Sequence, residues 1–107
     1  MSAGSQIEMF PHVTPEADIA SLMQLLRTYG WLTRKALTTQ LGWAERRIRA
    51  VAEAAGADVV RGPRGFNLFD NCSLDEINHC AAIAEGQGKK MVEYAVALRR
   101  RAHARIS

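Results

Sequence analysis

The sequence predicts a mainly α-helical fold with one small β-hairpin, and three observations carry this prediction. Apolar residues recur at helical spacing in four segments, which predicts helices near residues 15–29, 33–41, 44–55 and 73–104. A short alternating run around a Gly-Pro-Arg-Gly turn predicts the hairpin near residues 58–69. The 107-residue chain is 48% hydrophobic, which is enough to build a core.

The order of these segments divides the chain into three parts. We expect a flexible tail over residues 1–13, a folded domain over residues 14–70 and a helical arm over residues 71–107. The first helix begins with Thr14 as N-cap and Pro15 at its first position, where these residue types are preferred. Its inner face is an apolar stripe of Ile19, Leu22, Met23 and Leu26. A short strand near residues 31–32 can add a third strand to the hairpin.

The run from residue 37 to residue 56 predicts two short amphipathic helices joined by a turn. Gly42 ends the first helix, because glycine enters the left-handed conformation without strain. Ala44 takes the N-cap position of the second helix, where it cannot accept a backbone N–H and costs about 1 kcal/mol of helix stability. The inner face of the second helix consists of Ile48, Val51, Ala52 and Ala55. The remaining surface of this helix carries three outward arginines: Arg46, Arg47 and Arg49.

The next segment predicts a hairpin with a basic tip. Pro63 fixes φ in the turn and Gly65 supplies a positive φ. Phe66 begins an alternation of apolar and polar residues that is typical of a half-buried strand. Arg61 and Arg64 are expected at the tip of this hairpin.

Two helices joined by a turn and followed by an arginine-tipped hairpin resemble the winged helix-turn-helix DNA-binding family. The resemblance implies that the second helix enters the major groove and that the hairpin, called the wing, touches phosphate or the minor groove. Residues 31–69 carry seven Lys and Arg residues against three Asp and Glu residues, which suits double-stranded DNA as the partner. The residues expected to bind DNA are Arg34, Lys35, Trp43, Arg46, Arg47, Arg49, Arg61 and Arg64. The same residues also fit an ordinary helical hairpin and a surface turn whose arginines serve solubility.

The last third of the chain begins with a capping box, because Glu76 follows Ser73 at the required spacing. A near-heptad stripe then runs along the expected helix and consists of Ile77, Ala84, Met91 and Leu98. Gly86 and Gly88 weaken this helix, so we expect either a break there or the close approach of another backbone.

Three interpretations of this arm are open. It can form a dimer, fold back over its own domain, or add phosphate contacts as a basic arm. We favour dimerisation, because a helix of about 30 residues runs roughly 45 Å and exceeds the width of one small domain. The stripe is then the interface of a homodimer that sets two recognition helices on one duplex.

The order of parts also resembles a set of small phage and prophage proteins, in which a winged helix precedes a long helix with a basic end. The matching residues here are Gly65-Phe66-Asn67-Leu68, Asp75-Glu76-Ile77 and Leu98-Arg99-Arg100-Arg101-Ala102-His103. The resemblance implies a phage or prophage DNA-binding protein, and transcription regulation is the expected function. The alternative is a winged-helix interaction module, a replication or packaging accessory that reads no bases.

Other functional classes find little support in the sequence. His12, His79 and His103 lie in separate segments, so we expect neither enzyme activity nor a metal site. Cys72 and Cys80 fit no metal pattern, and Cys80 is expected to be a small buried apolar residue. The sequence has no Gly-rich phosphate loop, and we expect no cofactor and no small-molecule substrate. We expect no membrane association and a cytoplasmic location, because no targeting signal or membrane-spanning run is present.

Overall fold

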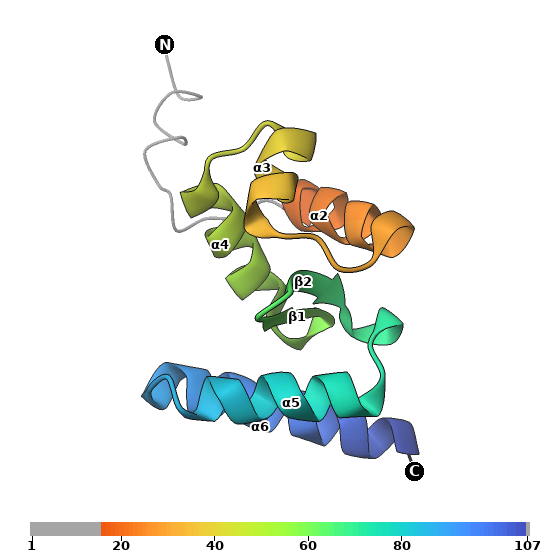
Figure 1. The fold of residues 1–107 in the computed structure, drawn as a ribbon, viewed down its shortest axis with the longest axis vertical. Coiled ribbons are helices and arrows are strands. Elements are labelled where there is room, and N and C mark those ends of the chain that lie inside the picture. Colours follow the sequence, from red (N-terminus) through yellow and green to blue (C-terminus); the bar gives the residue numbers. More distant parts are fainter. Residues whose placement is uncertain (1–15, 107) are drawn as a thin grey trace.

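The computed structural model of the chain describes residues 16–106 and confirms a mainly helical fold with a small hairpin (Figure 1). The helices are α2 (Glu16–Tyr29), α3 (Arg34–Leu41), α4 (Glu45–Ala55), α5 (Leu74–Glu85) and α6 (Lys89–Ile106). The strands are β1 (Val59–Gly62) and β2 (Gly65–Leu68), flanked by 3₁₀ turns at Gly56–Asp58 and Phe69–Asn71. The expected tail over residues 1–13 and the expected helix start at Thr14 and Pro15 lie outside the described residues.

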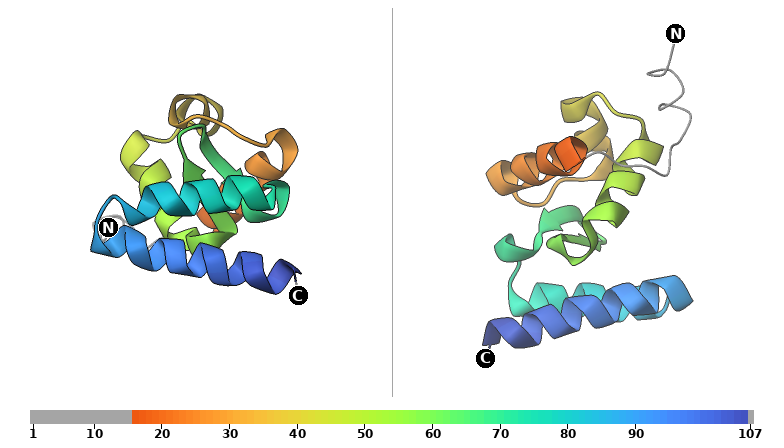
Figure 2. Two further views of the ribbon diagram at one scale, coloured as in Figure 1. Left: turned by 60° about the horizontal axis from the view of Figure 1, so that its bottom comes forward. Right: turned by 180° about the vertical axis from the view of Figure 1, so that it is seen from behind.

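The hairpin lies between two helical layers. Helices α2, α3 and α4 form one layer, and α5 and α6 run antiparallel to each other in the second; Figure 2 shows this arrangement from two further sides. Each layer has its own cluster of buried side chains. Val59 belongs to the cluster of the three-helix layer and Val60 to the cluster of the α5–α6 layer. The hairpin is therefore a wall shared by both clusters, because successive side chains of a strand point to opposite faces.

The hairpin is short and its strands pair in an antiparallel register from Val59↔Leu68 to Gly62↔Gly65. The expected third strand is reduced to one bridge, in which Leu32 and Phe66 exchange backbone hydrogen bonds of 3.0 and 2.9 Å. Gly65 makes this approach possible, since a Cβ atom there would lie 2.2 Å from the carbonyl oxygen of Leu32.

The turn between α3 and α4 confirms both predictions made for it. Gly42 caps α3 in the left-handed conformation with φ of 71°, and its N–H donates to the carbonyl oxygen of Thr38. Ala44 is the N-cap of α4 and its side chain makes no capping hydrogen bond. The inner face of α4 is also as expected, with Ile48 and Val51 buried against α2 and α3.

The C-terminal third is a helical hairpin and not one continuous helix. Helix α5 ends at Glu85, Gly88 adopts a φ of 125°, and α6 begins at Lys89. The break falls at residues 86–88, where the two glycines of the sequence predicted it. The capping box at the start of α5 is present, because the Ser73 hydroxyl accepts from the Glu76 N–H and the Glu76 carboxylate accepts from the Ser73 N–H.

This fold-back corrects the expectation that the stripe of the arm forms a dimer interface. Ile77 and Leu98 are 0% exposed, and Ala84 is 2% exposed, in the cluster that α5 and α6 build with the hairpin. Met91 packs against the same cluster and is half-buried. A stripe of apolar residues shows that a helix face is buried, but it does not show against what. Here the partner surface belongs to the same chain, so these side chains are not available to a second copy.

The basic end of α6 is likewise engaged within the chain. Arg99 pairs with Glu85 on α5, and Arg101 pairs with Asp58 beside the hairpin. Arg105 donates to the carbonyl oxygen of Cys72 at 2.9 Å. These contacts fasten Arg99, Arg101 and Arg105 to the rest of the protein, so the C-terminal run is not a free arm, although Arg100 is exposed there.

Candidate nucleic-acid interface

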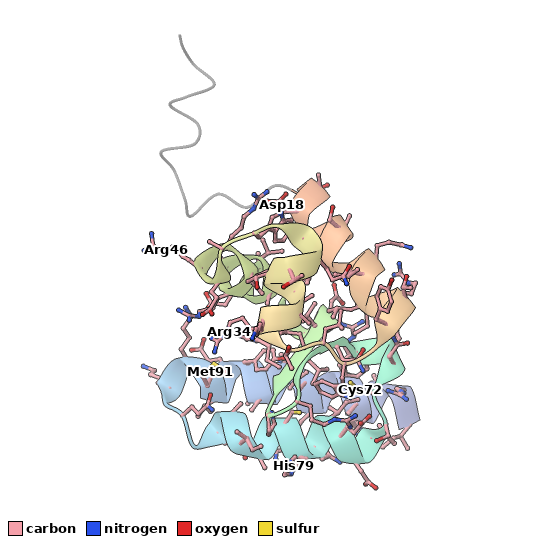
Figure 3. All side chains as sticks on the ribbon, turned by 45° about the horizontal axis from the view of Figure 1, so that its top comes forward. Asp18, Arg34, Arg46, Cys72, His79 and Met91 are labelled. Atoms are coloured by element: carbon pink, nitrogen blue, oxygen red, sulfur yellow. The ribbon has the colours of Figure 1, made fainter. Side chains whose placement is uncertain are left out.

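An open groove of about 780 Å³ lies between the three-helix layer, the turn of the hairpin and the segment in which α5 passes into α6. We call it the basic groove. Its charged lining residues are Arg34, Lys35, Arg49 and Arg61 with Glu45 and Glu53. Figure 3 shows Arg34 of α3 and Met91 of α6, which line the groove from the two layers, on the same side of the molecule. Basic side chains outnumber acidic ones in this lining, so the groove favours an anionic partner.

Arg46 and Arg49 are the unengaged arginines of α4. Both are exposed, and within residues 16–106 neither has an ion-pair or hydrogen-bond partner. Arg46 projects away from the protein (Figure 3). Their exposure follows from the sequence, because Ile48, Val51 and Ala52 direct the opposite face of the helix into the core. Two guanidinium groups are therefore presented to solvent from one helix.

The start of α3 places two further cations beside α4. Thr33 caps this helix by accepting the Ala36 N–H at 3.1 Å, which fixes the direction of its first turn. Arg34 lies 3.6 Å from the carboxylate of Glu45, with both side chains about half exposed or more. Lys35 is exposed. An exposed pair of this kind contributes little to stability, so Arg34 can exchange Glu45 for another anion at small cost.

Arg47 has a different position from the one that the sequence suggested. Its guanidinium group bonds both carboxylate oxygens of Asp18 on α2, with Nη2 2.9 Å from each oxygen. It also stacks on Trp43, with Cζ 4.3 Å from the ring centroid. Trp43 is half-buried and packs against the core of the three-helix layer. Arg47 and Trp43 therefore join α4 to α2, and they are separate from the basic groove.

Arg61 lines the groove but is not at a free tip. Its guanidinium carbon lies 3.9 Å from the centroid of the Tyr94 ring, and its backbone N–H donates to the Tyr94 hydroxyl at 3.0 Å. The Nε atom of Arg61 is buried and has no hydrogen-bond partner among the described residues. Stacking on Tyr94 holds the guanidinium plane at the groove wall.

Arg64 at the turn of the hairpin is drawn to α5 and away from the basic groove. It donates to Glu76 at 2.9 Å and lies 5.2 Å over the ring of Trp31, whose indole N–H donates to the same carboxylate at 3.1 Å. The hydrogen bond from the Ser73 N–H, followed by those from its other partners, holds the pKa of Glu76 below 4.5. The expected tip arginine is thus paired with α5, although its side chain remains 65% exposed.

Sequence reasoning treated the cations after the glycine break only as part of a basic C-terminal arm, and it did not place the turn between α5 and α6 beside α4. Lys90 lies 3.7 Å from the Glu53 carboxylate of α4, and Gln87 and Met91 line the basic groove. The available signal was the pair Lys89-Lys90 directly after the glycine break, in a helix whose first turn has no acidic residue. Only the folded chain shows that this pair comes to lie beside α4.

The two cysteines are buried and unbonded. Burial is the main cause that raises the pKa of the Cys72 thiol to about 12, so this thiol stays protonated at neutral pH. Cys80 is buried on α5, as expected, where it packs against Gly62. In the part of the chain that the structure describes, no three His, Cys, Asp or Glu side chains are grouped to hold a metal ion.

The chain matches no protein-family model, no curated protein and no solved structure. Across residues 16–106, none of the helices combines the length and apolar character needed to cross a membrane. Function is therefore inferred from the geometry and charge of the basic groove and of α4.

Proposed function

We propose that residues 16–69 form a winged-helix domain that binds double-stranded DNA, with α4 in the major groove. The observation that carries this proposal is the pair Arg46 and Arg49, two exposed arginines of one helix that have no partner among the described residues. The order of elements supports it: α2, the Leu32 bridge, α3, α4 and then the hairpin follow one another as in the winged-helix family. A DNA-binding regulator is the class of protein that this surface fits best.

The side chains divide into base-reading and phosphate-binding groups. Arg46 and Arg49 are long enough to reach base edges, and a guanidinium group pairs bidentately with guanine. Arg34 and Lys35 flank α4 from the start of α3 and fit phosphate contacts, which fix the register of a protein on the duplex. Arg47 holds α4 against α2 through Asp18 and reads no base.

The test is a DNA titration that separates sequence preference from general affinity. A duplex selected from a random-sequence library and an unrelated duplex of equal length are titrated at two salt concentrations. The Arg46→Ala/Arg49→Ala variant should lose at least about 5- to 150-fold of the preference between the two duplexes, which is the loss expected when one bidentate pair contributes about 1–3 kcal/mol of discrimination.

The matched control removes two positive charges elsewhere. Arg27→Ala/Arg100→Ala changes an exposed arginine near the end of α2 and one in the C-terminal half of α6. In Figure 1 both segments lie on the side away from the α5–α6 turn. This control should keep the preference of the wild type. Wild-type protein that binds neither duplex at low salt would overturn the proposed function.

A second candidate is a protein-interaction module, favoured by the outer face of α6. Val92 and Val96 are 39% and 41% exposed and lie four positions apart, so they form one small apolar patch. A second copy of the chain is the partner to test first, because two-fold contacts are the commonest among soluble oligomers. Light scattering over a range of concentrations decides the matter. A mass that stays that of a monomer, unchanged in Val96→Asp, excludes this contact.

A further inference from the structure

We propose that the turn between α5 and α6 takes the place of the hairpin tip as the second DNA contact, with Lys89 and Lys90 binding phosphates beside α4. This inference rests on the proposed DNA-binding function and names a contact that a winged helix alone does not have. The partner is the phosphate backbone of the duplex that α4 enters.

The hairpin tip directs its arginine to α5 and not to the basic groove. Arg64 is held by Glu76 and stacks over Trp31. Behind the tip, Gly62 lies so close to α5 that a Cβ atom there would be 2.4 Å from the sulfur of Cys80. The strand behind the tip is therefore packed against α5. The Arg64 side chain is 65% exposed but is paired on the α5 side, so the phosphate contact beside α4 falls to another residue.

The α5–α6 turn occupies the neighbouring position on the same face. Lys90 lies 3.7 Å from Glu53 in the last turns of α4, and Gln87 and Met91 form the wall of the basic groove that faces Arg34. In Figure 1 the turn and the start of α4 lie on the same side of the molecule. Cations thus stand near both ends of the exposed face of α4: Arg34 pairs with Glu45 in its first turn, and Lys90 pairs with Glu53 in its last turn.

This arrangement fits a duplex better than a single strand or an acidic protein patch. A helix in the major groove lies between two phosphate backbones, so cations near both ends of that helix can each meet phosphate. Lys90 is 82% exposed and Glu53 is 41% exposed, so their pair is a weak surface contact. Lys90 can leave Glu53 for a phosphate with little loss of stability. Lys89 is exposed and has no partner among the described residues.

The test compares salt dependence in full-length protein. The Lys89→Ala/Lys90→Ala variant is titrated with the selected duplex and the unrelated duplex at several salt concentrations, beside the Arg27→Ala/Arg100→Ala control with the same net charge. The slope of log affinity against log salt should become shallower by about one for each lysine lost, for both duplexes alike. The preference between the two duplexes should stay that of the wild type. Circular dichroism confirms that the variants are folded.

The outcomes separate this inference from the function on which it rests. If wild type binds and the lysine variant has the slope of the Arg27→Ala/Arg100→Ala control, the α5–α6 turn makes no phosphate contact and the inference is wrong, while DNA binding stands. If wild type does not bind at all, the proposed function itself fails. An Arg64→Ala variant gives an independent check: it should keep the wild-type slope, and a loss of about one unit would return the wing role to the hairpin tip.

Discussion

The hydroxyl group of Tyr94 connects α6 to the first strand of the hairpin. It donates to the carbonyl oxygen of Val59 at 2.6 Å and accepts the N–H of Arg61 at 3.0 Å. Both partners are backbone groups, so one side chain from α6 satisfies two positions of β1. Burial is the main cause that raises the pKa of this phenol above 10.0, which keeps the donating proton in place.

Tyr94→Phe should lower the free energy of unfolding by about 1–3 kcal/mol, because the buried Val59 carbonyl and the partly buried Arg61 N–H both lose the hydroxyl. Urea unfolding followed by circular dichroism measures this loss. Tyr29→Phe is the matched control, since Tyr29 is 60% exposed and should change stability by less than about 0.5 kcal/mol. Equal effects of the two substitutions would show that the Tyr94 hydroxyl does not stabilise the contact between α6 and β1.

Gly65→Ala should be among the most destabilising single substitutions in the hairpin. The added methyl group would meet the backbone of Leu32, with the nearest atom 2.2 Å away, at a φ of 110° that side chains rarely adopt. We expect a loss of at least about 2 kcal/mol, measured by thermal or urea unfolding. Gly86→Ala is the control, because its new methyl group has no neighbour closer than 3.5 Å. A Gly65→Ala protein as stable as this control contradicts the close approach.

Glu76 should make the stability of the protein fall in acid. Its pKa in the folded state lies below 4.5, mainly because the Ser73 N–H donates to the carboxylate. The stabilising contribution is therefore complete above about pH 4.5 and is lost as the pH falls through the lower folded value. The difference in unfolding free energy between wild type and Glu76→Gln should shrink between pH 6 and pH 3. A difference that stays constant over this range would rule out the depressed pKa.

Arg47 should act on stability and not on base preference. Arg47→Ala removes the contacts to Asp18 and Trp43, and we expect a loss of up to about 1 kcal/mol, because the pair is partly exposed. A double-mutant cycle with Asp18→Ala measures the coupling between the two side chains. Sequence preference in the DNA titration should match that of the wild type. If Arg47→Ala relaxed this preference as strongly as Arg46→Ala, the assignment of Arg47 as a positioning residue would be wrong.

Local signals in the sequence predicted much of the fold correctly. Gly42 marked the end of a helix, Ser73 with Glu76 marked the start of another, and Gly86 with Gly88 marked the break. Each of these signals depends on residues within about one helical turn, where backbone conformation and capping bonds are decided. The expected bounds of α3, α4 and the hairpin therefore lie close to those of the structure.

Contacts between distant segments could not be read from the same patterns. Arg47 and Asp18 are 29 positions apart, and nothing in the periodicity of α4 distinguishes Arg47 from Arg46. The sequence around Arg64 indicated a free tip residue. Its partner Glu76 belongs to α5, and the sequence alone did not show that this helix packs against the hairpin. The expected dimer stripe had the same origin, since an apolar face indicates burial but not the identity of the covering surface. Of the basic residues predicted to bind DNA, four line the basic groove: Arg34, Lys35, Arg49 and Arg61. Arg47 and Arg64 pair with carboxylates outside it.

The shared hairpin has a consequence for strand register. Val59 and Val60 are adjacent, yet their side chains belong to different buried clusters. A slip of β1 by one residue would exchange the two faces, and each layer would receive a side chain shaped for the other. A hairpin with one buried face resists such a slip from that face alone, whereas this one is held from both faces. Four residues per strand are enough here, because an error in pairing would unpack both helical layers at once.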